Sequence, residues 1–275
     1  MRWIVILVAI SLGLPGALGA QQAKAPTLED ILDRLQTNLN HYDAGVPNFF
    51  CDEHIVSSQM QPEMRDQNTV VDSVFRLMRA LKPDHSTSLV ESREIQFVDG
   101  KPPASQHFDA PTMPSGAFEG GLALVSRDQA ACMNYTLQRV NKSHPAGPYI
   151  VRFASVMAAQ QPANCLLQEN SKGRVVVDPA SLQIIRLEVS TPHHLIIPGN
   201  SYTAPIVGRR DITVDYAPVS LGDETFWMPS AIIMRNTSGA GTFHMMVWSF
   251  RATYRNYHRL EVTSRILPGF ATPAP

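Results

Sequence analysis

The segment Cys51-Asp52-Glu53-His54 places a thiol, two carboxylates and an imidazole in consecutive positions. Side chains of these types ligate metals and transfer protons in acid–base catalysis. The surrounding residues alternate between polar and apolar types, which predicts a strand, and on a strand Cys51 and Glu53 face opposite to Asp52 and His54. The four groups then cannot converge on one ligand, and we interpret the segment as an ordinary strand with a polar outer face.

A second cluster, His193-His194, follows Pro192 at the end of an expected strand. It has no acidic or cysteine neighbour close in sequence, which favours a solvated loop over a surface metal site. The chain contains no G-x-S-x-G, H-E-x-x-H or C-x-x-C motif and no glycine loop that would cradle a phosphate. The sequence therefore favours a protein that is not an enzyme and that needs no cofactor or metal.

Methionine and aromatic residues gather in the C-terminal part of the chain. They are interpreted either as core packing or as an adaptable apolar wall for a lipid chain, and both interpretations remain open at this point. The candidate ligand-binding residues on the second interpretation are Phe226, Met228, Met246, Trp248 and Phe250.

Hydrophobic spacing predicts one N-terminal helix, followed by strands for most of the chain. Thr27 is a suitable N-cap with Asp30 at the capping-box position, and Gly45 and Pro47 end the helix. The apolar stripe of this helix consists of Leu28, Ile31, Leu32, Leu35 and Leu39. From Phe49 the apolar period changes to two. The expected strands are Phe49–Met60, Val70–Leu81, Ser86–Val98, Met133–Val140, Tyr149–Val156, Cys165–Glu169, Arg174–Val177, Leu182–Ser190, Val207–Tyr216, Glu224–Arg235, Phe243–Arg255 and Leu260–Leu267.

The hairpin GRVVVDPASLQIIRLEVSTP, residues 173–192, is typical of these strands. In its second arm Ile185, Leu187 and Val189 are expected on one face, opposite Arg186, Glu188 and Ser190. One dry face and one wet face indicate an antiparallel sheet that is exposed on one side. The predicted fold class is mainly β (α+β): a large curved antiparallel sheet or half-barrel, covered by the N-terminal helix and by a helical insert within residues 101–129.

The first twenty residues are typical of a secretory signal peptide. Met1-Arg2 is positively charged, a short apolar run follows, and the exit consists of small residues. The apolar run is too short to cross a membrane, and no second span is expected. We therefore expect an exported protein, periplasmic or extracellular, with residues 1–20 removed and residues 21–275 forming one domain.

Charge content bears on the class of partner, and cysteine content bears on disulfide formation. The chain has 23 basic and 24 acidic residues, scattered along its length, so no basic stripe for nucleic acid is expected. Of three cysteines, Cys132 and Cys165 each precede or begin an expected strand in the same sheet region, and we pair them as a disulfide. Cys51, between Phe50 and Asp52, is then interpreted as a buried small hydrophobe.

An ordered series of segments resembles a group of exported proteins of soil acidobacteria that have no assigned function. The series consists of Asn48-Phe49-Phe50-Cys51, EIQFVDGKP, Gly116-x-Phe118, GRVVVDPASLQIIRLEVSTP, VDYAPVSLGDETFWMPS and FRATYRNYHRLEVTSRI. That group is in turn similar to the lipoprotein-carrier superfamily of the Gram-negative periplasm. The resemblance implies a curved antiparallel half-barrel, closed by helices over an apolar cavity that takes acyl chains. It supplies no ligand-contact residues, because the shared motifs are strand and turn patterns.

The expected function is that of an exported, non-enzymatic binding protein. Its ligand would be a lipid, a lipoprotein or another envelope protein held under the dry face of the sheet. Two alternatives remain: a hydrolase with a site of dispersed His, Asp and Glu residues that includes His54, and a structural module that pairs with an envelope partner through a sheet edge.

Overall fold

The computed structural model describes residues 25–60, 66–83, 87–105, 117–138, 147–157, 160–167, 169–196, 206–238 and 245–260. Its helices are α1 (Leu28–Gly45), α2 (Ala117–Ala123) and the short 3-10 helix η1 (Arg127–Gln129). Its strands are β1 (Phe49–Met60), β2 (Asp66–Leu81), β3 (Thr87–Val98), β4 (Met133–Gln138), β5 (Tyr149–Ser155), β6 (Lys172–Val177), β7 (Ile184–Ile196), β8 (Ile206–Leu221), β9 (Glu224–Ser238) and β10 (Met245–Arg259).

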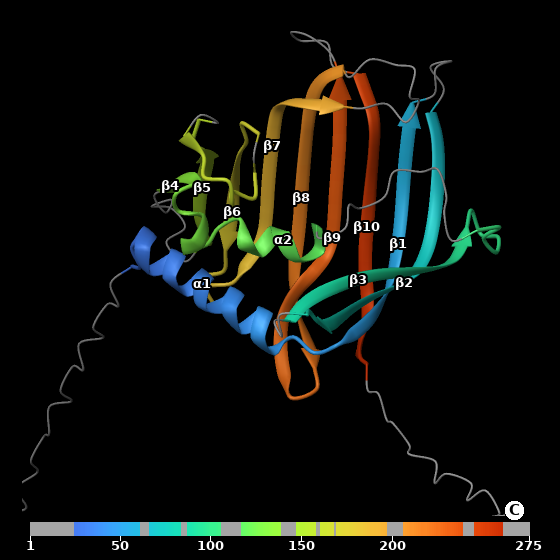
Figure 1. Cartoon of the computed structure of the whole chain (residues 1–275), viewed down its shortest axis with the longest axis horizontal. Coiled ribbons are helices and arrows are strands. Elements are labelled where there is room, and N and C mark those ends of the chain that lie inside the picture. Colours follow the sequence, from blue (N-terminus) through green and yellow to red (C-terminus); the bar gives the residue numbers. More distant parts are fainter. Residues whose placement is uncertain are drawn as a thin grey trace, which may run out of the picture.

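The ten described strands form one curved, unclosed antiparallel sheet, which confirms the predicted fold class (Figure 1). Their order is β3-β2-β1-β10-β9-β8-β7-β6-β5-β4. Neighbours in the sheet are neighbours in sequence except at one seam, where β1 pairs with β10. Helices α1 and α2 lie against the same face (Figure 1). We call this the inner face and the opposite one the outer face.

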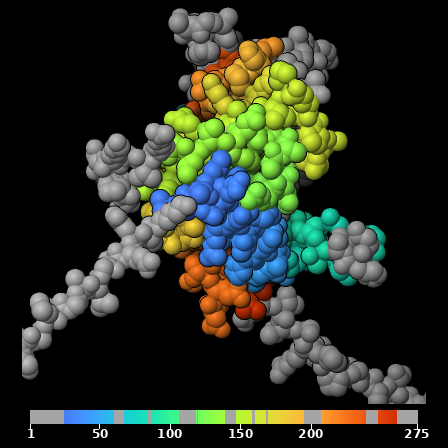
Figure 2. Space-filling model, turned by 90° about the vertical axis from the view of Figure 1, so that its left-hand side faces the viewer, coloured from blue at the N-terminus to red at the C-terminus, as the bar shows by residue number. Residues whose placement is uncertain are grey.

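The structure confirms the expected start, apolar stripe and end of helix α1. The Thr27 hydroxyl accepts from the backbone of Asp30, and the Asp30 carboxylate accepts from the backbone of Thr27, which completes the capping box. The apolar stripe is buried against the sheet, with Ile31 and Leu35 at 0 and 4 % exposure. Figure 2 shows α1 in blue beside the green segment that carries α2, η1 and β4.

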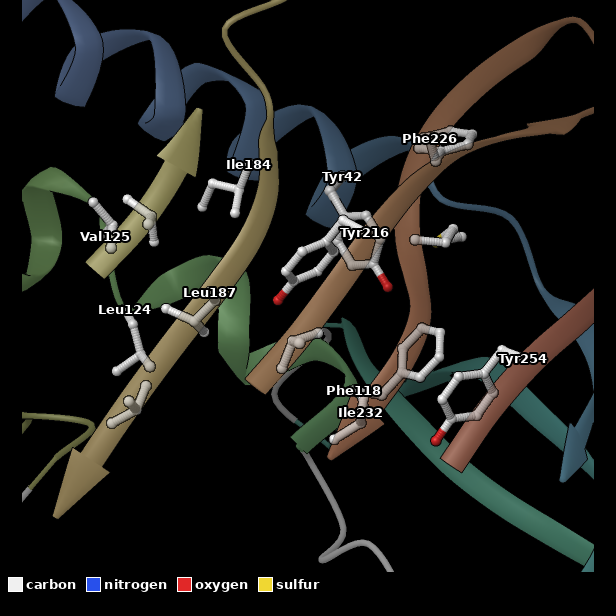
Figure 3. Close-up of a cluster of buried hydrophobic side chains, with 14 of the residues drawn as sticks. Tyr42, Phe118, Leu124, Val125, Ile184, Leu187, Tyr216, Phe226, Ile232 and Tyr254 are labelled. Atoms are coloured by element: carbon white, nitrogen blue, oxygen red, sulfur yellow. The ribbon is translucent and has the colours of Figure 1, made fainter. Parts of the chain in front are cut away.

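Helix α2 sits close to the inner face because it carries glycine at one position. A methyl group at Gly121 would collide with the hydroxyl of Tyr216 on β8, whereas one at Gly120 would meet nothing. The same closeness lets Phe118 reach across the sheet, where its ring stacks on Phe75 of β2 and meets Tyr254 of β10 edge-on (Figure 3). The insert therefore fills the centre of the half-barrel.

Several expectations about individual strands differ from the structure, and β7 and β8 run to Ile196 and Leu221, past the expected ends at Ser190 and Tyr216. The described residues of Cys165–Glu169 form a loop, because their backbone bonds to side chains instead of a neighbouring strand: the amide of Leu166 donates to Oε1 of Gln129. A β-bulge in the β6–β7 hairpin turns Ile184 instead of Ile185 into the core, where it is 2 % exposed.

β10 continues to Arg259, past the expected end at Arg255. A bulge near Asn256, which has φ 55°, accommodates one extra residue of β10 opposite β1, and pairing resumes at His258 and Arg259. The further strand expected over Leu260–Leu267 lies outside the described residues after Leu260.

Candidate functional site

The inner face is closed where α1 and α2 cover it. Phe226 and Met228 of β9 are 2 and 0 % exposed, and the Phe226 ring stacks on His41 and meets Tyr42 edge-on, both from α1. The cavity beside Phe226 measures only about 20 Å³, room for about one water molecule. In this conformation the helices leave no space there for an acyl chain.

Farther along β8–β10, away from α1, lies a second part of the inner face that we call the distal patch. It consists of Arg210 and Ile212 on β8, Met234 and Asn236 on β9, and Trp248 and Phe250 on β10. Arg210, Asn236 and Trp248 lie side by side in one row, and the other three in the next. The rings of Trp248 and Phe250 stack with centroids 6.1 Å apart.

The distal patch combines apolar surface with polar groups that lack partners. Trp248 and Ile212 are half-buried, while Phe250 and Met234 are buried. Asn236 is 2 % exposed, and neither its Oδ1 nor Nε of Arg210 has a hydrogen-bond partner among the described residues. A buried polar atom without a partner costs about 1–3 kcal/mol, so such pairs mark places where a further group fits.

The five candidate residues from the sequence therefore do not form one wall. Phe226 and Met228 lie beneath the helices, whereas Trp248 and Phe250 lie in the distal patch. Phe226 is ten residues from Asn236, the cross-strand partner of Trp248, which is about 30 Å along a strand. Met246 lies on β10, and its side chain is outside the described ones.

The β5–β6 connection contacts the edge of the distal patch through Glu169. Glu169, in the β5–β6 connection, accepts from Nδ1 of His194 at 2.9 Å and lies 3.7 Å from the Arg210 guanidinium. The same connection carries Cys165, and the expected Cys132–Cys165 disulfide is present with the two Cα atoms 5.5 Å apart.

The prediction of a solvated loop at His193-His194 is wrong, because His194 lies on β7 with its side chain 16 % exposed.

A buried ionic cluster lies at the other end of the inner face. The fully buried Glu53 carboxylate accepts from Nε of Arg93 at 2.9 Å, from the Ser73 hydroxyl at 2.7 Å and from the Tyr254 hydroxyl at 2.9 Å. Burial by itself lowers the pKa of Arg93, but the charge of Glu53, its hydrogen bond to Arg93 and the charges of Tyr254 and Glu91 together outweigh burial and raise that pKa. The Arg93 guanidinium also lies 5.0 Å above the Phe75 ring. The cluster ties β1, β2, β3 and β10 together, which is a structural role.

The segment Cys51-Asp52-Glu53-His54 divides between the two faces as predicted. Cys51 and Glu53 are buried, and Asp52 and His54 are exposed. Cys51 is a free thiol, and burial raises its pKa, so it stays protonated and unreactive at neutral pH.

On the outer face, Nδ1 of His54 lies 2.7 Å from Oδ1 of Asp72, beside a groove of about 610 Å³. A carboxylate that orients an imidazole is one part of an acid–base site. Both side chains are about half exposed. Within the described ranges no three His, Cys, Asp or Glu side chains gather as a metal ion would require. No described helix is long and apolar enough to cross a membrane.

Sequence reasoning missed Arg93, Glu169, Arg210 and Asn236. For three of them, the alternation pattern of the sequence contains a recognisable sign. Arg93 falls in phase with Leu89 and Ile95 at period two, and Arg210 and Asn236 continue the apolar phases of β8 and β9. A polar residue in the apolar phase of a strand indicates a buried polar site. Glu169 had no such signal, because its partners come from other strands.

No protein-family model and no curated protein matches the sequence. Among solved structures, the chain is similar to a LolA superfamily protein of Nitrosomonas europaea, with TM-score 0.34, 7% identity and coverage of 87% of this chain and 96% of that one. It is also similar to a DUF1329 family protein of Desulfovibrio piger, with TM-score 0.35, 7% identity and coverage of 84% and 92%. A MucA/MucB complex of Pseudomonas aeruginosa gives TM-score 0.21, 13% identity and coverage of 83% and 94%.

Proposed function

We propose that the chain is an exported binding protein whose distal patch takes a lipophilic ligand with an anionic head group. Residues 1–20 act as a cleaved signal peptide, residues 21–275 form one domain, and the protein is not an enzyme. The basis for export is the charge, apolar run and small-residue exit of the N-terminus, together with a disulfide, which persists in oxidising compartments.

The observation that carries the ligand class is the pair of buried polar atoms next to an apolar row. Nε of Arg210 can donate to a carboxylate or phosphate, and Oδ1 of Asn236 can accept from a hydroxyl or N–H group of the same head group. The half-buried Trp248 and Ile212 offer apolar surface directly beside them. A ligand with an apolar chain and an anionic head group that also carries a hydroxyl or N–H group satisfies both sets of side chains.

The packing of α1 against its part of the inner face also favours ligand binding at the distal patch. A ligand under α1 would first have to displace Phe226 and its aromatic neighbours, because the cavity there is about 20 Å³. At the distal patch the ligand meets side chains that are already half accessible. Of the five residues proposed from the sequence, Trp248 is the first contact, Phe250 is buried and stacks on it, and Met246 precedes it on β10.

Tryptophan fluorescence tests this placement. In a chain that starts at Gln21, the variant Trp227→Phe leaves Trp248 as the single tryptophan, since the third one is Trp3. Titration with oleate below its micelle concentration should change the Trp248 emission saturably. Arg210→Met should weaken the apparent affinity about ten- to hundredfold, because a hydrogen bond to a charged group contributes about 1.5–3 kcal/mol.

The matched control is Arg251→Met, which removes an exposed arginine from the outer face of the same sheet. It should bind oleate as the parent does. Absence of a saturable change, or equal affinities for the Arg210 and Arg251 variants, would contradict the proposal. Urea unfolding of each variant shows whether it is folded at the titration temperature.

A further inference from the structure

The outer face of β5–β9 carries a groove that the proposed function does not use. It lies on the side of the sheet turned away from α1 and α2 in Figure 1, and its volume is about 580 Å³. Five basic side chains line it: Arg152, Lys172, Arg174, Arg209 and Arg235. This volume is in the range of small-molecule sites.

The positive charges of the groove exceed its negative charges. Arg174 forms a bidentate pair with Glu188, at 2.8 and 2.9 Å, and Nε of Arg209 lies 2.9 Å from Asp211. Glu188 and Asp211 are the two acidic side chains of the lining.

The other three basic side chains have no such partner. Among the described residues, Arg152 bonds only the neutral Gln138, and neither Lys172 nor Arg235 has an ion pair. The groove thus holds three uncompensated cations, although the whole chain has a net charge of −1.

The strand register adds an unfavourable contact that an anion would relieve. Arg152 and Arg174 are direct cross-strand partners on β5 and β6. Like charges in this position destabilise a sheet, and Glu188 compensates only Arg174. Lys172 is two residues before Arg174 and points to the same face. Three cations therefore share one end of the groove.

Arg235 approaches from the other end, in register with Asp211, Ser190 and Lys172. Three strand spacings of ~4.8 Å separate the backbones of Lys172 and Arg235 by about 14 Å, which two long side chains can span. The hydroxyl groups of Ser190 and Thr213 lie in the lining between them and can donate hydrogen bonds.

We propose that this groove binds an anionic ligand through its phosphate or carboxylate groups. Guanidinium and ammonium groups from both ends converge on the bound oxyanions, and the hydroxyls complete their hydrogen bonding. This site is on the opposite face from the distal patch and holds whether or not the distal patch binds a lipophilic ligand.

Calorimetric titration with inorganic triphosphate tests the site in a chain that starts at Gln21. We expect saturable binding at one site, weaker at 200 mM than at 50 mM salt because the contacts are electrostatic. The double variant Arg152→Gln/Arg235→Gln should lose at least tenfold in affinity. The control Arg251→Gln, on the same face outside the lining, should bind as the parent does.

Thermal unfolding without ligand distinguishes a binding role from a structural one. Because Arg152→Gln removes a like-charge contact, its Tm should be unchanged or higher than that of the parent. A large fall in Tm would mean that the cations stabilise the fold, and it would overturn the proposal.

Co-sedimentation with vesicles of phosphatidylcholine, with and without 30% phosphatidylglycerol, identifies the source of the anion. Binding to the anionic vesicles that the double variant abolishes assigns the groove to a lipid head group, and binding to triphosphate alone assigns it to a free anion. Binding to neither, or binding that the double variant leaves intact, overturns the proposal.

Discussion

Two buried ionisable residues of β1 illustrate how the environment sets the behaviour of a side chain. Glu53 is fully buried, and Arg93, Ser73 and Tyr254 all donate hydrogen bonds to its carboxylate. Removing one member of such a cluster leaves an uncompensated buried charge, which costs about 3–5 kcal/mol in comparable pairs. Cys51, two residues away, has mainly apolar surroundings, and burial raises its pKa.

The raised pKa of Cys51 predicts a loss of stability at alkaline pH. The unfolded thiol ionises near pH 8.5, while the folded thiol keeps its proton, so the unfolded state binds fewer protons above that pH. The free energy of unfolding should then fall by up to about 1.4 kcal/mol per pH unit. Cys51→Ala should remove this slope between pH 8.5 and 10.

Urea unfolding of both proteins at several pH values measures the difference. The pKa values of Tyr216 and Tyr254 are also raised by burial, but these groups act above pH 10 and equally in both proteins. Identical slopes between pH 8.5 and 10 would show that Cys51 does not titrate differently on folding.

At the scale of elements, the position of α2 depends on one of two adjacent glycines. Gly121→Ala would drive a methyl group into the Tyr216 hydroxyl, and we expect it to destabilise the protein by about 1–3 kcal/mol, as overpacking does. Gly120→Ala meets nothing within 4 Å and should stabilise the protein by up to about 1 kcal/mol through helix propensity. Thermal or denaturant unfolding of the two variants compares them directly.

Tyr216→Phe should partly rescue the Gly121→Ala variant. It removes the oxygen that the new methyl group would meet, and that hydroxyl has no hydrogen-bond partner among the described residues. Adding it to Gly121→Ala should recover part of the lost stability. If the two alanine variants are equally stable, α2 does not pack on β8 as described.

At the scale of the whole molecule, the sheet is completed by a pairing between chain ends. The seam between β1 and β10 joins residues about 200 apart in sequence, such as Glu53 and Tyr254. The strands at and beside the seam carry core residues at 0 or 1 % exposure, including Phe49, Ile55, Ile232 and Ala252. The seam thus joins strands from the two ends of the chain and is well packed on its inner side.

Hydrogen exchange should reflect this arrangement. We expect the slowest amide exchange in β1, β9 and β10, and the fastest strand exchange in the edge strands β3 and β4, where one side of each strand is unpaired. Exchange measured by mass spectrometry on peptides from each strand checks the order. Faster exchange in β10 than in β4 would contradict the seam as a stable part of the sheet.

The features that the sequence predicts correctly are those set by local physics. Alternation of apolar residues identified most of the strands and their buried faces, and the Thr27–Asp30 capping box marked the start of α1. The reason for pairing Cys132 with Cys165 was only half right, since Cys165 lies in a loop. The Ile184 bulge escaped detection because a bulge depends on the opposing strand as well as on its own residues.

By itself the sequence determined a one-sided antiparallel sheet with an N-terminal helix, because side-chain alternation and helix capping act between residues close along the chain. Only the tertiary structure decided that the helices fill one part of the inner face and leave the distal patch half accessible. It also brought Arg210 to Glu169 and Asn236, and Arg152 to Arg174. These contacts depend on strand order and register. Both are set by the packing of side chains that are far apart in the sequence.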